Sequence, residues 1–427
     1  MRYNRGIPFF HQEVSATARS HSHQPPRRRF TGALLAAAAL LLCGGLIFLL
    51  TRSGSRQPSA PTSPKTDTSP SAGVENTVIH LAAAGDVNVT DNTVAAGQNG
   101  GSYDYTDVFL DAVPLLADAD LTVVNFEGTL CGAPYGTETT SAPAEMMTAL
   151  RNAGVDLVQT ANSCSIAGGL VGLAETLDGV RSAGLEPVGT FRDSAEFKKT
   201  GGYTIREVRG IRIAFVAFTK GMNNRGLPAG SEDCVNLLYE DYASTYQSVD
   251  TAAITRVLQA VQSENPDLTV ALLHWGSEYN DQISSTQESI RNLMISEGVD
   301  VILGTHSHYV QEIDYDETDH TLVAYSLGDF LGDAQRAGSN YSLILNLEIT
   351  KNGETGETYV SGYRYDPIFI RTSGSLRVLR MDAAIAAYKA DNIDRVTKDE
   401  YDAMVYAKTR IEERIHPAAD TADSGDS

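Results

Sequence analysis

Cysteine is scarce in this sequence, with four residues in a chain of 427. Small secreted domains that depend on disulfides are much richer in cysteine, so this chain is not a disulfide-dense scaffold. Cys43 lies in an apolar run near the start of the chain, which leaves Cys131, Cys164 and Cys234. These three can form at most one intramolecular pair, and the sequence leaves open which two residues would form it.

Basic side chains are also few. The chain has 33 lysines and arginines against 54 aspartates and glutamates, for a formal net charge of −21. Residues 1–31 contain six arginines and a single acid, Glu13, so they carry about +5 and the remainder is more acidic still. Nucleic-acid binding depends on clustered Lys and Arg, so this balance predicts that nucleic acid is not a partner.

Charge is absent from residues 32–50. This 19-residue apolar segment is long enough to cross the hydrocarbon core of a bilayer as a helix. Arg27, Arg28 and Arg29 precede it, and the positive-inside rule places them in the cytoplasm. We therefore expect a cytoplasmic basic tail over residues 1–31, a single transmembrane helix over 32–50, and a C-terminal domain that is anchored to the cell membrane and extracytoplasmic.

Two other roles for the apolar segment stay open. It could be a cleaved signal peptide, although its length exceeds the roughly 7–15 residues of a usual signal core. It could also be a lipoprotein signal with Cys43 as the acylated residue, although Leu42 stands where a small residue is usual.

Large apolar side chains are few in residues 51–75, which are rich in Ser, Pro and Thr. We expect residues 51–77 to be a flexible, extended linker that lifts the folded part away from the membrane. Residues 417–427 are small, polar and acidic, and we expect a disordered tail there.

From residue 78 onward, expected strands alternate with expected helices, which is typical of an α/β sandwich. The expected helices cover residues 107–117, 144–153, 169–183, 251–263 and 284–296. After His308, three expected strands at 322–327, 341–349 and 359–365 follow without helices between them, which predicts mixed sheets. We expect this domain to cover residues 78–380, and C-terminal helices to fill residues 381–416.

Five apolar runs lead directly into side chains that can bind a metal ion. In an open α/β sheet, ligands bind just beyond the carboxyl ends of the strands, so five such endings predict one convergent site. The runs cover residues 78–85, 121–124, 155–161, 268–273 and 299–305, and the polar residues that follow are Asp86, Asn125, Glu127, Asn162, His274, His306 and His308.

Carboxylate, amide and imidazole groups suit divalent ions such as Mn, Fe or Zn. The sequence therefore predicts one or two such ions, and two close together could clamp the oxygens of a phosphoester displacement. His306 and His308 are two residues apart, and on an extended segment their side chains should point the same way. The expected ligands are Asp86, Glu127, Asn162, His274, His306 and His308, with Asn125 as a further residue of the site.

Each of these residues also has an ordinary structural explanation. A lone histidine at a strand end, such as His274, is more often hydrogen-bonded than metal-bound, and Asp86 could merely cap a turn. The convergence of several such residues is what favours a metal site. Glu278 is a candidate for a supporting role or a polymer contact. The weaker candidates are Asn88, Asp329 and Asp333.

Six motifs make the chain resemble the CapA family of poly-gamma-glutamate capsule biosynthesis proteins. They occur in the family's order and cover roughly residues 78–332. The motifs are Ala84-Gly-Asp-Val87, Asp120-Leu-Thr-Val-Val-Asn-Phe-Glu-Gly128, Ala161-Asn162, His274-Trp-Gly-Ser-Glu-Tyr279, Gly304-Thr-His-Ser-His308 and Tyr325-Ser-Leu-Gly-Asp-Phe330. The resemblance implies a fold similar to that of calcineurin-like metallophosphatases, and an exported domain agrees with the expected anchor.

The chain departs from the family's pattern in one motif that bears on catalysis. The family commonly has Ala-Asn-Asn-His followed by an Asp, whereas this chain has Cys164 in place of the His and Ala167 in place of the Asp. In the related phosphatases that histidine acts beside the metals, so its replacement affects catalysis more than metal binding, for which Asn162 remains. A milder departure is Asp329, where the family usually has Asn.

The resemblance implies a role in the synthesis, export or attachment of an anionic surface polymer such as poly-gamma-glutamate. The partners would be the membrane and the polymer or its membrane-bound synthase complex. Three classes stay open: a metal-dependent hydrolase or transferase that acts on a phosphoester or an amide of envelope substrates, a non-catalytic accessory subunit, and a wall-binding scaffold without metal. Cys164 at the usual histidine position favours the accessory subunit over the enzyme.

Overall fold

The computed structural model describes residues 75–392 and 395–417. The expected basic tail and transmembrane helix, most of the expected linker and most of the acidic tail lie outside these residues. Within the described ranges, no helix combines the length and the apolar character needed to cross a membrane.

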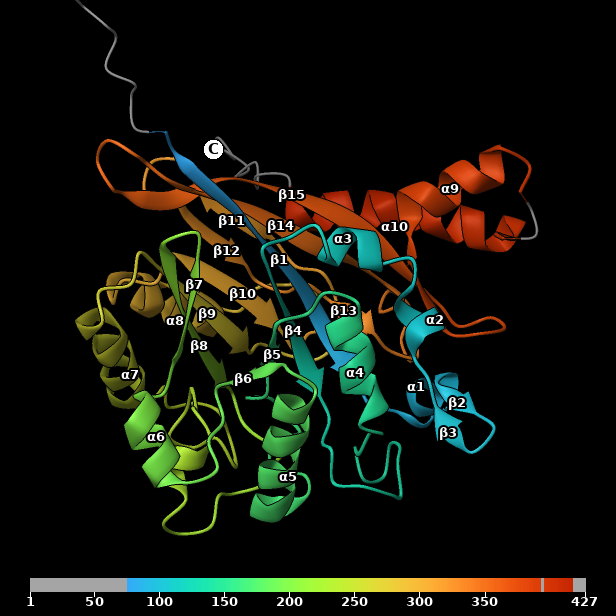
Figure 1. The fold of residues 1–427 in the computed structure, drawn as a ribbon. Coiled ribbons are helices and arrows are strands. Elements are labelled where there is room, and N and C mark those ends of the chain that lie inside the picture. The colour runs from blue at the N-terminus through green and yellow to red at the C-terminus, as the bar shows by residue number, and fades with distance from the viewer. Residues whose placement is uncertain (1–74, 393–394, 418–427) are drawn as a thin grey trace, which may run out of the picture. The chain divides into compact units, whose positions relative to one another are not determined.

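The first sheet has eight strands in the order β16-β15-β14-β1-β4-β5-β6, with β13 paired to β1 (Figure 1). The strands β13, β1, β4, β5 and β6 are parallel, and β14, β15 and β16 add antiparallel neighbours. Their bounds are β1 Thr77–Asn88, β4 Leu121–Glu127, β5 Leu157–Gln159, β6 Glu186–Val188, β13 Asp329–Leu331, β14 Tyr341–Lys351, β15 Thr358–Arg371 and β16 Arg377–Arg380.

The second sheet has six strands in the order β11-β12-β10-β9-β8-β7. Its four central strands are parallel, and the edge strands β7 and β11 are antiparallel. Their bounds are β7 Thr204–Val208, β8 Ile211–Thr219, β9 Leu268–His274, β10 Val301–Thr305, β11 Ile313–Asp316 and β12 Thr321–Ala324. The expectation of mixed sheets is confirmed. A further two-stranded ribbon joins β2 (Gln98–Asn99) and β3 (Ser102–Tyr103).

Most expected helices occur within two residues of their predicted bounds. Helix α8 shows why: Ser284 caps it, and Gln287 completes a capping box with the backbone of Ser284. The bounds are α1 Asp91–Ala96, α4 Glu145–Asn152, α5 Gly169–Ser182, α6 Ser194–Thr200, α7 Thr251–Ser263, α8 Ser285–Ser296, α9 Met381–Lys389 and α10 Lys398–Ile415, with a 3₁₀ turn at Glu232–Cys234.

One expected helix, over residues 107–117, is wrong. The structure has two short helices there, α2 (Thr106–Phe109) and α3 (Val113–Leu116). Pro114 lies in the first turn of α3. Proline lacks the backbone N–H that an uninterrupted helix needs and clashes with the preceding turn, so the segment breaks before it.

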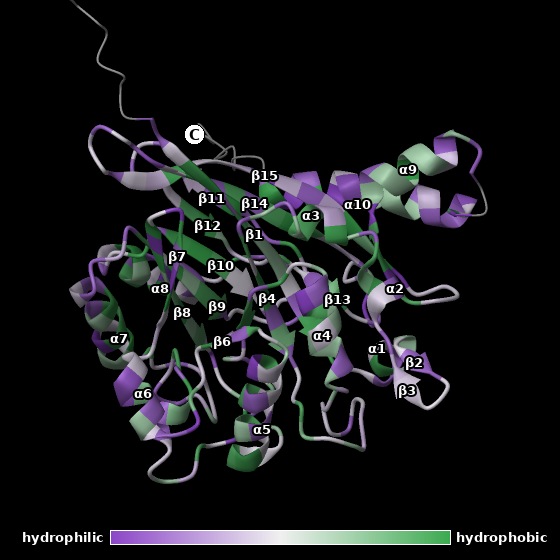
Figure 2. Ribbon diagram, viewed as in Figure 1, coloured by the Kyte–Doolittle hydropathy of each residue, from purple (hydrophilic) through white to green (hydrophobic). Residues whose placement is uncertain are grey.

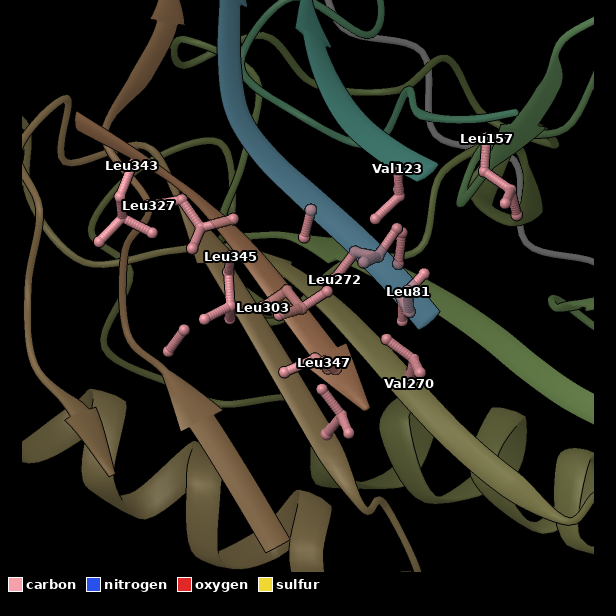
Figure 3. Packing of buried hydrophobic residues seen from close by; sticks show 14 of the residues in the cluster. Leu81, Val123, Leu157, Val270, Leu272, Leu303, Leu327, Leu343, Leu345 and Leu347 are labelled. Carbon is pink, nitrogen blue, oxygen red and sulfur yellow. The ribbon is translucent and has the colours of Figure 1, made fainter. Parts of the chain in front are cut away.

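The main hydrophobic cluster is shared by the two sheets (Figure 3). Leu81 and Val123 of the first sheet and Leu272 and Leu303 of the second belong to it, and each is at most 3% exposed. A second cluster joins the first sheet to α2 and α4, and a third joins the second sheet to α7 and α8. The two sheets therefore pack face to face with helices outside them, and apolar residues concentrate on the strands (Figure 2).

Candidate metal centre

The candidate site lies where parallel strands of both sheets end. In the first sheet Asp86 pairs with Asn125, and in the second sheet His274 pairs with Thr305. Asp86, Glu127 and His274 are in the final residues of their strands rather than beyond them, because hydrogen-bonded pairing continues through these polar positions.

Six side chains form two groups at these strand ends. Within each group, one ligand atom from each residue lies within 4.8 Å of the others. The first group is Glu127, His274 and His306, and the second is Asp86, His308 and Asp329. All six residues are buried. The structure thus brings together five of the six expected ligands, and adds Asp329, which was among the weaker candidates.

The first group has ligand atoms without a protein partner. His274 Nε2 lies 3.4 Å from Glu127 Oε1 and 2.9 Å from Ser163 Oγ, and its Nδ1 lies 3.1 Å from Thr305 Oγ1. In contrast, Glu127 Oε2 and His306 Nδ1 are buried and make no hydrogen bond within the described residues. Leaving buried polar atoms unpaired is costly, so these two atoms fit a ligand shell that an ion would complete.

The second group is paired within itself. His308 Nδ1 lies 2.8 Å from Asp329 Oδ1 and 3.8 Å from Asp86 Oδ2. Asp86 Oδ2 also accepts the backbone N–H of His306 at 3.1 Å, so the aspartate contacts the segment that carries both histidines. The carboxylates of Asp86 and Asp329 are neighbours because β1 pairs with β13 at these residues.

Asn125 and Asn162 form a buried hydrogen-bonded chain behind the carboxylates. Asn125 Nδ2 donates to Asp86 Oδ1 at 2.5 Å, and Asn162 Nδ2 donates to Asn125 Oδ1 at 3.0 Å. Asn162 Nδ2 also donates to the Phe126 carbonyl at 2.6 Å, while its Oδ1 accepts the backbone N–H of Cys164 at 2.9 Å. The side chain of Asn162 therefore orients Asn125 in this structure, and its role as a ligand stays a prediction.

Burial and charge shift the two inner carboxyl groups in opposite directions. Burial, reinforced by the charge of Glu127, raises the pKa of Asp86 to about 7. Burial acts on Glu127 in the same sense, but the charges of His274 and His308, with a hydrogen bond from His274, lower its pKa to about 2. Glu127 is therefore ionised at neutral pH, whereas Asp86 is close to its titration point.

The two neighbouring histidines also differ. Burial, together with the charges of His274 and Lys220, holds the pKa of His306 well below its usual range. Burial would do the same to His308, but the carboxylates of Asp329, Glu127 and Asp86 instead raise its pKa to about 11. His306 is a neutral imidazole, the form that binds metals, whereas His308 must release a proton first.

The expectation that His306 and His308 lie on an extended segment is wrong. Their backbones have φ of 91° and 59°, in the left-handed region, so the segment is not extended. Their ring centroids lie 6.4 Å apart, and each ring joins a different group. Positive φ is strained for residues other than glycine, and such strain is concentrated at functional sites.

Two glycines allow one segment to contact both sheets at the site. The carbonyl of Gly328 accepts the N–H of Asp86 at 3.0 Å, and the carbonyl of Gly304 accepts the N–H of Leu327 at 3.0 Å. A Cβ on Gly85 would lie 1.8 Å from Gly328 O, and one on Gly304 would lie 1.9 Å from Tyr325 O. Residues 325–329 can approach both strands this closely only because neither position has a side chain.

Cys164, at the position where the family's histidine would stand, is buried and unpaired. Burial and the charge of Glu127 raise the pKa of its thiol above the ordinary range. Cys131 and Cys234 are also unpaired, so none of the three cysteines in the described part of the chain forms a disulfide. The thiol is thus protonated at neutral pH and is a poor substitute for an imidazole acid.

Two hollows open over the groups. One of about 280 Å³ includes Glu127, His308, Asp329 and Cys164 in its wall, and the other, of about 270 Å³, includes Ser163 and His306. Glu278 and Asn223 line both hollows, so the two hollows form one continuous cleft. The candidates Asn88 and Asp333 line the first hollow, and exposed Glu278 lies at its rim rather than among the ligands.

Sequence reasoning missed Ser163 and Lys220 as residues of the site. Ser163 directly follows the expected ligand Asn162, and Lys220 directly follows the apolar run of β8. That run, Ile211–Thr219, was the available signal: it is a buried strand beside β9, and its carboxyl end meets the same site.

The chain belongs to a family of bacterial capsule synthesis proteins. Residues 80–334, more than half of the chain, match the family described as "Bacterial capsule synthesis protein PGA_cap". Among curated relatives, "Capsule biosynthesis protein CapA" of Bacillus anthracis is 28% identical over 213 residues, which are 50% of this chain and 49% of that protein. "PGA biosynthesis protein CapA" of Bacillus subtilis is 25% identical over 209 residues, 49% of this chain and 51% of that protein. The chain thus spans about half the length of the curated relatives it matches.

Solved structures are more distant. A calcineurin-like phosphoesterase from Bacillus subtilis has 14% identity and a TM-score of 0.42, covering 78% of this chain and all of that one. A phosphatase from Mycoplasma pneumoniae has 13% identity and the same TM-score of 0.42, covering 69% of this chain and 95% of that one. Similarity at this level carries no conclusion about the chemistry of the site.

Proposed function

We propose that this protein acts in the synthesis, export or attachment of an anionic surface polymer, with poly-gamma-glutamate as the case its family implies. It does so as an anchored, extracytoplasmic domain that holds one or two divalent ions. The observation that carries the metal site is the pair of adjacent buried groups, of which the first has two ligand atoms without partners. Mn, Fe and Zn all suit these carboxylate and imidazole ligands.

The ions would lie between the two sheets. Glu127, His274 and His306 would hold one ion, and Asp86, His308 and Asp329 the other, with Asn125 orienting Asp86. A divalent ion supplies positive charge for anionic oxygens of a substrate and activates water. The residues of the chain fix the positions of the ligands, and the cleft above them gives access from solvent.

Holding a polymer or a synthase complex is the function that the site supports best. Cys164 occupies the position of the family's histidine, and its protonated thiol is a weak proton donor near neutral pH. The second candidate is a metal-dependent phosphoesterase or amide hydrolase. It is favoured by one observation, that the cleft leaves both groups open to a substrate.

Metal content tests the proposal. The full-length protein, incubated with Mn, Fe or Zn and freed of excess ions, should retain one or two ions per chain by elemental analysis. His306→Ala with His308→Ala should abolish this and should remove the thermal stabilisation that a bound ion gives. His80→Ala is the matched control, because His80 is an exposed histidine on the same strand as Asp86. Zero metal in the wild-type protein would refute the site.

Topology tests the anchored location. On intact cells, external protease should cut within residues 51–77 and release a fragment that carries the C-terminus. A C-terminal tag that stays protected until the cells are opened would contradict this orientation.

Activity on a generic phosphoester with Mn added separates the two candidate functions.

A further inference from the structure

Lys220 is fixed in place beside the first group. Its backbone N–H donates to the carbonyl of His274 at 2.8 Å, so the residue is tied to the strand that supplies a candidate ligand. Its Nζ donates to the carbonyl of Gly276 at 2.6 Å and lies 4.7 Å from the centre of the Tyr246 ring. The ammonium is thereby held on the wall of the hollow that also contains His306.

The charges in the cleft are unevenly distributed. Among the described residues that line the two hollows, Lys220 is the one lysine or arginine. The hollow over the second group is instead lined by the acids Glu127, Asp329 and Asp333, and Glu278 lies between the two hollows. Without bound ions, an anionic group is therefore attracted more strongly to the Lys220 side of the cleft than to the acidic side.

The contact with Gly276 leaves Lys220 with donors to spare. An ammonium has three N–H donors, and the structure assigns one of them to the Gly276 carbonyl. Ser163, Asn223 and Asn224 line the same hollow, and their side chains carry a hydroxyl and two amide groups. These groups provide hydrogen-bond donors for the oxygens of a carboxylate or phosphate.

We propose that Lys220 is the anion-binding residue of the cleft and holds a carboxylate or phosphate group of the substrate beside His306. The inference rests on the proposed function, because it names the substrate class of the same site. It also sets a direction: the anionic group occupies the Lys220 hollow, and the cleft continues from there past Asn223 and Glu278 over the second group.

Binding to two anions tests the inference. Calorimetric titration of the full-length protein would use inorganic phosphate and a short γ-linked glutamate oligomer, each on metal-free and on Mn-loaded protein. Lys220→Gln should weaken binding on the order of tenfold, since a charge-assisted hydrogen bond is lost. Lys220→Arg should stay close to wild type, and Lys199→Gln, which removes an exposed lysine on α6, should be unchanged.

The two probes distinguish the sources of the anion. Lys220-dependent binding of the glutamate oligomer with little affinity for phosphate identifies a polymer carboxylate, and the reverse identifies a phosphoester. Equal affinity of wild type and Lys220→Gln for both probes overturns the inference. If wild type retains no Mn, the metal site fails on its own, whereas the titrations on metal-free protein still decide the role of Lys220.

A measurement on the wild-type protein covers the case in which Lys220→Gln fails to fold. Amine acylation mapped by mass spectrometry should show that whichever probe binds protects Lys220 and leaves Lys199 unprotected. Equal labelling of Lys220 with and without both probes would overturn the inference without any variant.

Discussion

The two ligand groups have similar compositions but differ in how they are held without an ion. In the group of Glu127, His274 and His306, a carboxylate oxygen and an imidazole nitrogen have no partner, and His306 is neutral. In the group of Asp86, His308 and Asp329, the imidazole is protonated and paired with a carboxylate at 2.8 Å. The first group therefore has unpaired atoms to offer an ion, whereas the second must give up an internal ion pair to bind one. We expect the ions to bind in that order.

Removing a ligand of the first group should have the largest effect. Glu127→Gln removes the charge of a carboxylate that has one oxygen without a partner. The first ion should therefore bind more than about 100-fold more weakly, which exceeds the loss typical of residues that only support ligands. Titration with Mn, followed by the fluorescence of the adjacent buried Trp275, measures this change. A variant that binds the first ion as tightly as wild type would reverse the proposed order.

Asp300 shows how burial shifts the pKa of a carboxyl group that lies outside the two ligand groups. It directly precedes β10, at the opposite end from His306, and its carboxylate accepts the N–H of Thr269 at 2.7 Å. Burial raises its pKa from 3.8 to about 6. A raised carboxyl pKa favours the folded state below pH 4, and this contribution is lost as the pH rises to 6.

Because of Asp300, the free energy of unfolding of the wild-type protein should fall by about 2 kcal/mol between pH 4 and 6, after allowance for partial exposure. Asp300→Asn should not show this fall. Urea denaturation of metal-free protein at these two pH values measures the change. An identical pH dependence in wild type and variant would show that burial does not raise the pKa of Asp300.

Asp329→Asn sharpens the difference between the groups. The change keeps an oxygen ligand but removes the charge that pairs with His308, so we expect the second ion to bind roughly tenfold more weakly and the first to be unaffected. Stoichiometry and affinity from calorimetry would show this. Equal weakening of both ions would mean that the groups act as one unit.

The smallest effect is expected at Cys164, in the wall of the cleft. Cys164→His introduces an imidazole with an ordinary pKa of about 6.5 beside Glu127. Phosphoesterase activity of Mn-loaded protein, which we expect to be weak or absent in wild type, should rise several-fold. General acid–base catalysis is worth roughly 10²–10⁴-fold in rate. We expect a smaller gain here because Ala167 stands where the family has an aspartate. Robust wild-type turnover that survives Cys164→Ala would show that the chemistry does not depend on this position.

Local patterns predicted most strands and helices, and the strand ends at which the candidate ligands lie, since apolar runs and capping residues largely determine these elements. The positions of Asp86, Glu127 and His274 followed directly from such runs. The division of the site into two groups did not, because it depends on the backbone turns at His306 and His308 and on the pairing of β13 with β1. Nor could the sequence show that Asn162 faces Asn125 or that Lys220 lies beside His306, since these contacts join residues far apart in the chain.

Gly85 and Gly304 limit which substitutions the sequence can accept near the site. Neither residue offers a functional group, and each is compatible with an ordinary strand on its own. Even alanine at either position would push residues 325–329 away, which would separate the two sheets where both groups lie. In a library of random substitutions, Gly85 and Gly304 should tolerate no replacement, because a Cβ there would lie 1.8 Å and 1.9 Å from a backbone carbonyl oxygen. Such a pattern would mark the spacing of the site, independently of any ligand residue.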